Sequence, residues 1–463
     1  MKASQYNVRT KYEATGETLL FNTLTTALLA LDTNTAVRVE ELLNEPNRAD
    51  QNGDLATYLL SRGFLVADNV DEFAIISERS TLGINDTNRL DVIVMPNMNC
   101  NLACTYCYEE HHKSAMSGET AANLLSWFQH MIPRFKVVLL SWFGGEPLLS
   151  YKSVIQIQQQ VRDMANAAGT GFLSHMTTNG YALSPERAAT LVSLGLHSYQ
   201  ITLDGVPETH NAMRPHRGGG GTFERIMANV CALVRTSSQV SVKLRVNYDE
   251  RNLNDIPALL GLFPEDVRDQ LDVVFERIFG QEYSNYEDAM QDREVGVKVE
   301  SLYQHAKNHG FPVSMNALEA DRLNYCYADR KNQFVFNYNG DVFKCTVDKF
   351  ESKDRLGRLT NEGMVSWEGA GERRDQWHAI PVFEDKCHTC TYAPLCMGGC
   401  RKVRGRLGTV GDSCKLPFAG FDKRLHYYYA NQRGDNIRQQ PPLQKLENGN
   451  RTYPVWKFKE VRE

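Results

Sequence analysis

The sequence lacks an apolar run long enough to span a bilayer, which takes about 20 consecutive apolar residues, so membrane insertion is not expected. Its first five residues are polar and do not resemble a secretory signal, and a cytoplasmic location is therefore expected. An excess of basic residues is also missing: the formal net charge of −5 argues against broad nucleic-acid binding. We find no internal repeat, which argues against a repeat architecture.

Length and composition are those of a soluble globular protein. With 463 residues the chain can form two or three domains, and 42% hydrophobic with 23% charged residues is ordinary for this class. Cysteine is the informative component. Of the 11 cysteines, all but Cys231 fall into two spaced groups, and disulfides are not favoured because thiols stay reduced in the cytoplasm.

The first cysteine group (Cys100, Cys104 and Cys107) has the spacing CxxxCxxC and follows an apolar, strand-like run. Three thiolates suit three irons of a four-iron cluster and leave the fourth iron open to a small molecule, which favours a catalytic cluster over an electron carrier. The CxxC part also fits a zinc site or a dithiol pair. Those alternatives explain neither Cys100 nor the aromatic residues Tyr106 and Tyr108.

Residues 99–109, which we call the cysteine loop, read NCNLACTYCYE and resemble the signature of radical S-adenosylmethionine (radical SAM) enzymes, in which an aromatic residue usually precedes the third cysteine. The resemblance implies that the open iron binds the amino and carboxylate groups of SAM. It also implies that an electron, from a flavodoxin- or ferredoxin-type donor, cleaves SAM to a 5′-deoxyadenosyl radical. His111 and His112 are expected to face solvent, because the three cysteines already account for the site.

A second motif follows the next apolar run. Gly144, Gly145, Glu146 and Pro147 resemble the GGEP motif at the end of the second strand of radical SAM enzymes. Glycines there allow the backbone to approach a ligand closely. The carboxylate of Glu146 would accept hydrogen bonds from the ammonium group of SAM. Alone, GGE is an ordinary strand-to-helix turn; its place one strand after the first cysteine group makes it informative.

Between residues 90 and 280, strand-like apolar runs alternate with amphipathic stretches that are typical of helices. The later strands are expected at 173–178, 199–203, 240–246 and 271–275, and helices at 118–131, 185–194 and 223–234. Six such alternations predict an α/β fold, a partial (β/α)6 TIM barrel with parallel strands. Ligands then bind at the carboxyl ends of the strands.

Polar residues that follow these strands are candidate SAM-binding residues by the same resemblance. We expect Thr202 and Arg225 near the carboxylate or the ribose of SAM. The others that line the site are Thr178, Asn179, Asp204 and Asn247. For Asn179 and Asp204 a plain turn role is equally open, since both precede glycine.

The second cysteine group consists of Cys326, Cys345, Cys387, Cys390, Cys396, Cys400 and Cys414. Their order resembles the SPASM extension of a branch of radical SAM enzymes, which binds two auxiliary four-iron clusters. By that similarity one cluster takes Cys326, Cys345 and Cys400, and the other takes the remaining four. Zinc stays open for the CxxC-containing part, although it leaves Cys326 and Cys345 without partners.

The ligand set of the first auxiliary cluster is one residue short. Some relatives supply a cysteine a few residues before the position of Cys326, but residues 316–325 contain none. Either a noncysteine ligand such as Glu319 or Asp321 closes the cluster, or one iron stays open to water or a substrate thiol. Asp348, close to this group, is a candidate general base.

About ninety residues precede the barrel and carry no metal-ligand pattern. Apolar runs at 19–22 and 27–31, helices expected at 37–43 and 55–63, and a strand expected at 64–66 resemble the winged-helix module that captures leader peptides in ribosomal peptide biosynthesis. Such modules add the peptide as a strand to a sheet edge. A domain that merely caps the barrel is the alternative.

These patterns predict four segments: a winged-helix-like module at 1–88, the barrel at 89–310, the auxiliary-cluster extension at 311–430 and a C-terminal tail at 431–463. The resemblances imply an enzyme with three [4Fe–4S] clusters and SAM that modifies a ribosomally synthesised precursor peptide carrying a leader. We expect an oxidative cross-link, a thioether or a C–C bond, because auxiliary clusters near the substrate would accept an electron from its radical. Epimerisation, side-chain oxidation of the anaerobic sulfatase-maturating type, and a noncatalytic iron–sulfur or zinc scaffold that binds a peptide are the alternatives.

Overall fold

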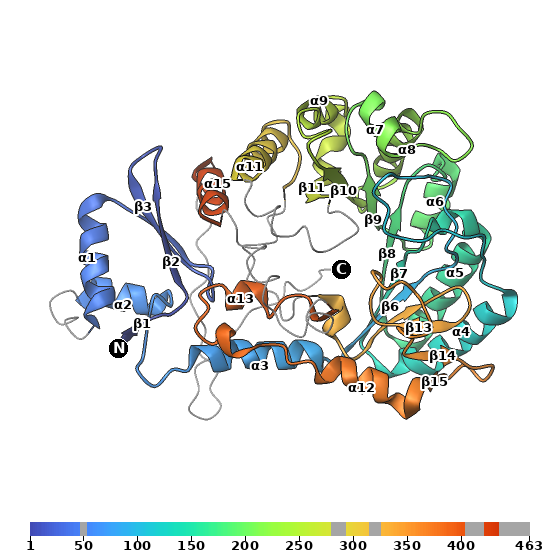
Figure 1. The fold of residues 1–463 in the computed structure, drawn as a ribbon, viewed down its shortest axis with the longest axis horizontal. Helices are drawn as coiled ribbons and strands as arrows, with labels where there is room; N and C mark the ends of the chain where they lie inside the picture. Colours follow the sequence, from blue (N-terminus) through green and yellow to red (C-terminus); the bar gives the residue numbers. More distant parts are fainter. Residues whose placement is uncertain (47–52, 279–292, 314–325, 403–420, 435–463) are drawn as a thin grey trace.

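The computed structural model describes residues 1–46, 53–278, 293–313, 326–402 and 421–434. Its main element is a ten-stranded sheet with the strand order β11-β10-β9-β8-β7-β6-β12-β13-β14-β15. Figure 1 shows the helices that follow β6 to β10 on the outer side of this curved sheet, away from the N-terminal strands and helices.

Six parallel strands form the barrel part of the sheet and alternate with helices, as the sequence predicts. The strands are β6 (Arg89–Val94), β7 (Val137–Trp142), β8 (Gly171–Thr178), β9 (Ser198–Thr202), β10 (Ser241–Tyr248) and β11 (Leu271–Arg277). The connecting helices are α4 (Gly118–Met131), α5 (Tyr151–Ala168), α6 (Pro185–Ser193), α7 (Pro207–Met213), α8 (Phe223–Thr236) and α9 (Ile256–Gly261). The α/β class and the largely parallel sheet are therefore confirmed.

Helix α5 shows why these segments fold as they do. Apolar residues recur every three or four positions, at Val154, Ile157, Val161 and Ala165, and all four are buried. Each buried Val or Ile side chain contributes on the order of 1.5–3 kcal/mol, which holds the helix in the main hydrophobic core. The helix ends at Gly169, whose φ of 68° is a left-handed conformation that glycine adopts without strain.

The C-terminal part continues the same sheet. Strand β12 (Gln333–Phe336) pairs in parallel with β6, with Phe336 opposite Val94. An antiparallel meander follows, made of β13 (Asp341–Phe343), β14 (Gly357–Leu359) and β15 (Val365–Trp367). The segments expected at 89–310 and 311–430 thus share one sheet, which the sequence analysis does not anticipate.

Further helices lie around this sheet and at the C-terminal end of the described chain. The α-helices are α11 (Arg293–Asn308), α12 (Glu372–Ala379), α13 (Ala393–Cys396) and α15 (Phe421–Gly434). Short 3-10 helices are η2 (Ile132–Arg134), η3 (Pro147–Ser150), η4 (Glu265–Gln270), η7 (Tyr327–Asp329), η8 (Glu368–Gly371) and η9 (Asp385–Cys387).

The N-terminal part has its own small sheets. Three antiparallel strands are β2 (Asn7–Tyr12), β3 (Glu17–Asn22) and β4 (Leu28–Leu31), and β1 (Lys2–Ala3) pairs with β5 (Leu65–Val66). The helices are α1 (Thr33–Asn44), α2 (Gly53–Ser61) and α3 (Glu72–Ile84). Strands and helices occur at the positions expected between residues 19 and 66, and β1, β2 and α3 are additional.

Both faces of the three-stranded sheet are covered. On one face Leu20 joins a core with Leu42 of α1. On the other, Leu19 and Phe21 pack with α15, where the ring of Phe421 lies 5.8 Å from that of Phe21. Neighbouring residues of one strand face opposite sides, so β3 contributes to both cores. Among the described residues no strand pairs with the outer side of β2, which leaves that edge open.

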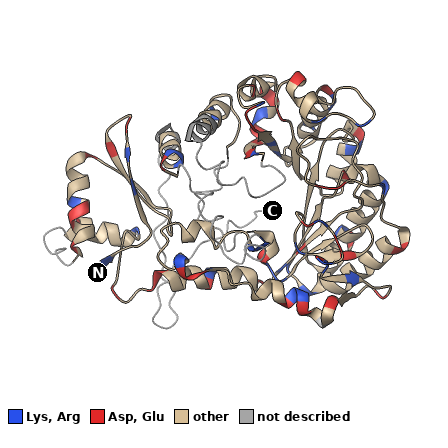
Figure 2. Cartoon of the chain, viewed as in Figure 1, with Lys and Arg blue, Asp and Glu red and all other residues tan. Residues whose placement is uncertain are grey.

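None of the helices in the described ranges is both long and apolar enough to cross a membrane. Figure 2 shows basic and acidic residues interspersed along the ribbon. This mixture agrees with the small net charge of the chain.

Candidate functional site

The first cysteine group lies where the parallel strands end. Strand β6 ends at Val94, and the cysteine loop follows within a few residues. Cys100 is buried, and Cys104 and Cys107 are partly buried. Barrels of parallel strands bind their ligands at this end of the sheet.

A second backbone segment, residues 213–217, holds the cysteine loop in place, and we call it the clamp segment. It runs antiparallel to the loop and includes a β-bridge between Leu102 and His216. Its backbone bonds join Ala103 N to Pro215 O (2.8 Å), Thr105 N to Met213 O (2.9 Å) and Arg217 N to Asn101 O (2.8 Å). The spacing of the cysteines is therefore fixed by protein hydrogen bonds.

The three thiols are close enough to influence one another. Burial, with a smaller contribution from the Cys104 thiolate, raises the pKa of Cys100 to about 12 and that of Cys107 to about 11. A metal that binds here must displace these protons. In the described parts of the chain, no three His, Cys, Asp or Glu side chains gather closely enough for a single metal ion. Thiolates are the ligands of the irons in iron–sulfur clusters, so the three cysteines fit such a cluster.

Gly144 and Gly145 press against the backbone that carries the cysteines. A Cβ on Gly144 would lie 2.4 Å from the carbonyl oxygen of Asn97, and a Cβ on Gly145 would lie 2.3 Å from that of Asn99. Gly144 also has a φ of 113°, which residues with a side chain rarely adopt. The close approach predicted for these glycines is made to the protein backbone, and Pro147 then begins η3.

Glu146 is fully buried and joins two strand ends. Its carboxylate accepts hydrogen bonds from the Thr178 hydroxyl and the Asn179 amide, both at 2.7 Å, and from the Leu148 amide at 2.9 Å. Its own amide donates to the carbonyl of Asn99 at 2.8 Å. Burial raises its carboxyl pKa, and these donors oppose that shift. Glu146 and Thr178 thus bind each other, and contact of either with an ammonium group stays a prediction.

Asn179 was expected either to stabilise a turn or to line the SAM site, and its side chain makes contacts of both kinds. Its Oδ1 accepts from the amide of Tyr181 at 2.9 Å, which is turn chemistry. Its Nδ2 donates to Oδ1 of Asn101 at 2.8 Å and lies 3.8 Å from Sγ of Cys100. The side chain therefore also ties the end of β8 to the cysteine loop.

Asp204 and Asn247 reach the cysteine loop through Tyr106. Asp204 accepts from the Tyr106 hydroxyl and, at 2.7 Å, from the amide of Asn247. Nδ2 of Asn247 donates to the Tyr106 oxygen at 3.1 Å. Arg214 completes the group: its Nη1 donates to the Tyr106 oxygen at 2.6 Å and lies 3.6 Å from the Asp204 carboxylate. Sequence analysis missed Arg214, because a lone arginine in a connecting segment has no spacing that marks it.

Thr202 and Arg225 lie in different surroundings. Thr202 ends β9 and is buried. Arg225 is exposed on α8, with its guanidinium carbon 4.2 Å from the centre of the Tyr181 ring. This stacking holds Arg225 beside the turn that follows β8. Contact of either residue with SAM stays a prediction.

The expectation that His111 faces solvent is wrong. His111 is half-buried, with Nε2 3.3 Å from Sγ of Cys107 and Nδ1 3.2 Å from the carbonyl oxygen of Met98. The chain turns back after the cysteine loop and brings the ring onto the thiol, which spacing alone does not reveal. His112 is exposed, and its Nε2 lies 3.2 Å from the hydroxyl of Tyr338.

Three members of the second cysteine group lie together: Cys326, Cys345 and Cys400. Burial raises the pKa of Cys326 to about 12, and the thiolates of Cys345 and Cys400 add to that shift. Burial also raises the pKa of Cys345 to about 11, again with a contribution from Cys400. These are the three residues that the resemblance assigns to one auxiliary cluster.

Asp348 is engaged in a nearly buried ion pair. Its carboxylate contacts Nζ of Lys402, and the two side chains are 8% and 10% exposed. Burial raises the pKa of Asp348, whereas Lys402 lowers it. Lys402 also donates to the carbonyl of Val347 at 2.6 Å. A proton-accepting role for Asp348 requires exchange of this partner and stays a prediction.

From the rest of the second cysteine group, Cys390 lies close to the N-terminal part. Cys387 ends η9, and the amide of Cys390 donates to its carbonyl at 3.3 Å. Cys390 packs against a core that contains Tyr6. Cys396 ends α13. Three sequence predictions fall outside the described residues: Cys414, Glu319 and Asp321.

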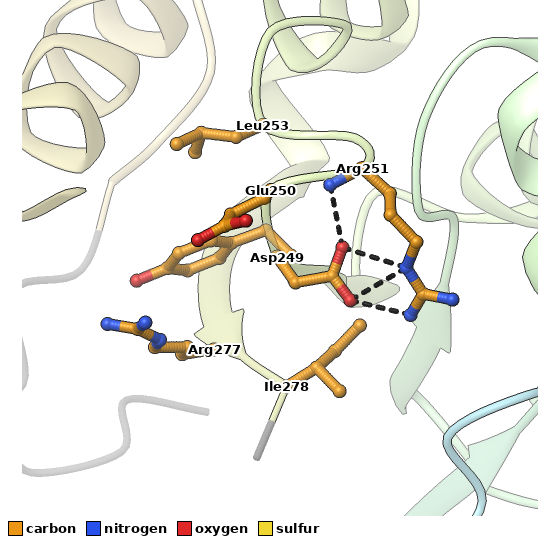
Figure 3. Close-up of a pocket in the computed structure, with 7 residues that line it drawn as sticks. Asp249, Glu250, Arg251, Leu253, Arg277 and Ile278 are labelled. Atoms are coloured by element: carbon orange, nitrogen blue, oxygen red, sulfur yellow. Dashed lines mark hydrogen bonds and ion pairs between the residues drawn. The ribbon is translucent and has the colours of Figure 1, made fainter. Parts of the chain in front are cut away.

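A cavity of about 310 Å³ lies beyond the ends of β10 and β11 (Figure 3). Its walls are Tyr248, Asp249, Glu250, Arg251, Leu253, Arg277 and Ile278. Asp249 and Arg251 form an ion pair within it, and Nη1 of Arg251 lies 3.5 Å from the hydroxyl of Thr105. The cavity therefore adjoins the cysteine loop and offers charges of both signs.

Comparison with known proteins identifies the family of the barrel. Residues 94–262, which include the cysteine loop and the strand ends around it, match the radical SAM superfamily. The chain contains a radical SAM domain. Radical SAM proteins use a [4Fe–4S] cluster and SAM.

Relatives of the radical SAM domain differ in how much of the chain they share. The pre-heme d1 synthase of Dinoroseobacter shibae is 29% identical over 167 residues, which is 36% of this chain and only 38% of that protein. The PqqA peptide cyclase of Rhodopseudomonas palustris is 22% identical over 332 residues, 68% of this chain and 84% of that protein. The solved structure of anSMEcpe with bound AdoMet and Cp18Cys peptide has a TM-score of 0.55 at 18% identity and covers 75% of this chain and 98% of that chain. This last likeness shows a shared fold.

Proposed function

We propose that this radical SAM enzyme modifies a ribosomally synthesised precursor peptide and forms an oxidative cross-link in it, a thioether or a C–C bond. The observation that carries the proposal is that two thiol sites lie next to neighbouring strands of the same sheet. The first cysteine group follows β6, Cys326 precedes β12, which is the parallel neighbour of β6, and Cys345 follows β13, which pairs with β12. The name of the PqqA peptide cyclase relative supports a peptide as substrate.

The residues present fit a [4Fe–4S] cluster and SAM at the cysteine loop. The first cysteine group would hold three irons, and the open iron would bind SAM. When bound, these groups supply the reductive cleavage of SAM to a 5′-deoxyadenosyl radical. The strand-end residues would orient SAM: Gly144, Gly145, Glu146, Pro147, Thr178, Asn179, Thr202, Asp204, Arg225 and Asn247. We assign two further clusters to the second cysteine group.

Tyr108 marks the space between the two thiol sites. Tyr108 directly follows Cys107 and is 52% exposed, and its hydroxyl is within electrostatic reach of the thiols of Cys107 and Cys345. A ring that is open to solvent but close to both thiols lines the region between them. A substrate residue against Tyr108 would lie between the site that removes a hydrogen atom and the site that accepts an electron. The net loss of two hydrogens that results is the balance of a cross-link.

Cys345→Ala is expected to separate SAM cleavage from product formation. The substitution leaves the first cysteine group intact, so 5′-deoxyadenosine should still form, while cross-linked peptide should fall by about tenfold or more, as for loss of a metal ligand. Chromatography of 5′-deoxyadenosine and mass spectrometry of the peptide measure the two. Val347→Ala, at a neighbouring side chain that is 37% exposed, is the control and should change neither. Equal product from Cys345→Ala and the parent protein would remove the auxiliary site from the proposal.

For capture of the leader we propose the open edge of β2. Both faces of its sheet are covered, so the edge is what remains for a peptide to pair with. The amide of Asn22 donates to the carbonyl of Ala27 at 2.9 Å, so even-numbered residues of β3 bond toward β4 and odd-numbered ones toward β2. Lys11 lies opposite Thr18, an even-numbered residue. Its amide therefore points to the open edge.

Lys11→Pro is expected to weaken binding of the leader peptide by about tenfold, because proline removes one edge donor worth about 1.5 kcal/mol. Proline is tolerated at such an edge position, so the sheet should stay folded. Lys11→Ala is the matched control, since it removes the same charge and keeps the amide. Fluorescence anisotropy with a labelled precursor peptide gives the affinities. If both variants bind like the parent protein, the peptide does not pair with this edge of β2.

Anaerobic reconstitution tests the function as a whole. About twelve irons per chain, reductive cleavage of SAM and a peptide that has lost two hydrogens are expected. A peptide of unchanged mass would instead indicate epimerisation, and a side-chain aldehyde, detected with a carbonyl-reactive reagent, would indicate side-chain oxidation. Tightly bound zinc without SAM cleavage would support a noncatalytic peptide-binding scaffold and overturn the proposal.

A further inference from the structure

We propose that Arg214 is the charge-compensating residue of the cysteine loop: its buried guanidinium stabilises the reduced state of the [4Fe–4S] cluster for which the first cysteine group is the proposed ligand set. The inference rests on the proposed function, because it concerns the same site. Arg214 belongs to none of the sequence motifs, and its effect can be measured as a change in the reduction potential of that cluster.

The position of Arg214 is fixed by the loop itself. Arg214 belongs to the clamp segment, and its side chain is 8% exposed. Its Nη1 donates to the hydroxyl oxygen of Tyr106 at 2.6 Å, and Tyr106 directly precedes Cys107. The carbonyl of Arg214 accepts from the hydroxyl of Thr222 at 2.9 Å. Backbone and side chain are thus both anchored, so the cation cannot swing away from the thiols.

One hydrogen-bond donor of Arg214 has no acceptor among the described residues. This donor is its buried Nε, whereas its Nη1 has an acceptor. Buried donors without a partner are rare, because desolvation without a compensating bond is unfavourable. An anionic group bound at the cysteine loop would provide the missing acceptor.

The charge of Arg214 acts on the thiols. Its guanidinium is within electrostatic reach of the thiols of Cys100, Cys104 and Cys107. The Asp204 carboxylate pairs with it at 3.6 Å and is its countercharge.

A cation is needed here because the surroundings are otherwise negative. Glu146 and Asp204 are fully buried carboxylates that follow β7 and β9, the two strands on either side of β8. Reduction of a cluster adds one more negative charge, and in a desolvated site the field of a single fixed cation is strong. Charge and hydrogen bonds near a cluster are what set its potential.

The experiment is an anaerobic redox titration of the full-length reconstituted protein, followed by electron paramagnetic resonance of the signal that changes when SAM is added. That criterion selects the cluster with an open iron from any auxiliary cluster. Four variants are compared with the parent protein: Arg214→Met combined with Asp204→Asn, Asp204→Asn alone, Arg214→Lys, and Arg235→Met. The double variant avoids an unpaired buried carboxylate, which Arg214→Met alone would leave. Arg235 is the control, because it forms an exposed ion pair with Asp266 on α8.

In the double variant the reduction equilibrium should move at least tenfold toward the oxidised cluster, which is about 59 mV for a one-electron couple. Asp204→Asn alone should shift the potential in the opposite direction, because it removes the countercharge and keeps the cation. Arg214→Lys should stay close to the parent value, and Arg235→Met should match it.

Either of two results overturns the inference: an unchanged potential in the double variant, or a shift in Arg214→Lys as large as in the double variant, which would assign a purely geometric role. If the double variant binds no iron, the test is the reduction potential of Asp204→Asn. A potential equal to or lower than that of the parent protein would overturn the inference. A parent protein that shows no SAM-responsive signal would instead contradict the proposed function.

Discussion

Cys107→Ala abolishes the reductive cleavage of SAM, on the arrangement described above, with an expected loss of about 100-fold or more in 5′-deoxyadenosine. Second-sphere changes already lower metal-site activity by about 10- to 100-fold, and removal of a ligand exceeds them. The thiol of Cys107 lies 3.3 Å from Nε2 of His111. Iron content and 5′-deoxyadenosine, measured anaerobically, report the loss.

Cys231→Ala is the matched control for this experiment. Cys231 is 6% exposed on α8 and lies outside both cysteine groups. Its removal deletes a buried thiol of the same kind without touching the cysteine loop, so iron content and SAM cleavage should equal those of the parent protein. Retention of both properties by Cys107→Ala would show that the radical arises elsewhere.

Gly145→Ala is expected to prevent cluster binding without changing any ligand. The new Cβ would lie 2.3 Å from the carbonyl oxygen and 2.6 Å from the carbonyl carbon of Asn99, and 2.8 Å from the carbonyl carbon of Met98. All three are backbone atoms, so relief requires the segment that leads into Cys100 to move. Overpacking of this kind destabilises a protein by about 1–3 kcal/mol, and iron bound at the cysteine loop should fall by about tenfold.

Gly118→Ala provides the comparison. A Cβ on Gly118 meets nothing within 4 Å, and the residue begins helix α4. Alanine favours a helix over glycine by up to about 1 kcal/mol, so this variant should be as stable as the parent protein or slightly more so. Normal iron binding by Gly145→Ala would mean that the loop tolerates displacement and that the glycine has another role.

Sequence patterns predicted the features that depend on local spacing. The six parallel strands, the helices between them and the place of the first cysteine group after β6 follow from periodicity and from a motif of eight residues. These elements and this motif are determined by residues that are close together in the sequence. Residues such as Val154 and Ile157 reveal a helix before any tertiary contact is known.

The contacts that hold the site were not predictable in the same way, because they join residues far apart in the sequence. The clamp segment pairs with the cysteine loop across more than one hundred positions, and Arg214 is buried only because of that pairing. Glu146 was expected to bind the ammonium group of SAM, but in the structure its carboxylate accepts a hydrogen bond from Thr178 at the end of the next strand. His111 illustrates the same limit, since whether it faces solvent or a thiol depends on where the chain turns back.

Strand β12 is hydrogen-bonded to β6, so the two strands that lead to the two thiol sites are held at a fixed distance from each other. The separation of β6 and β12 is therefore fixed by strand pairing and does not change as it would across a hinge. The same pairing makes the halves inseparable: a shortened protein that ends before β12 would present the flank of β6 to solvent and tend to aggregate.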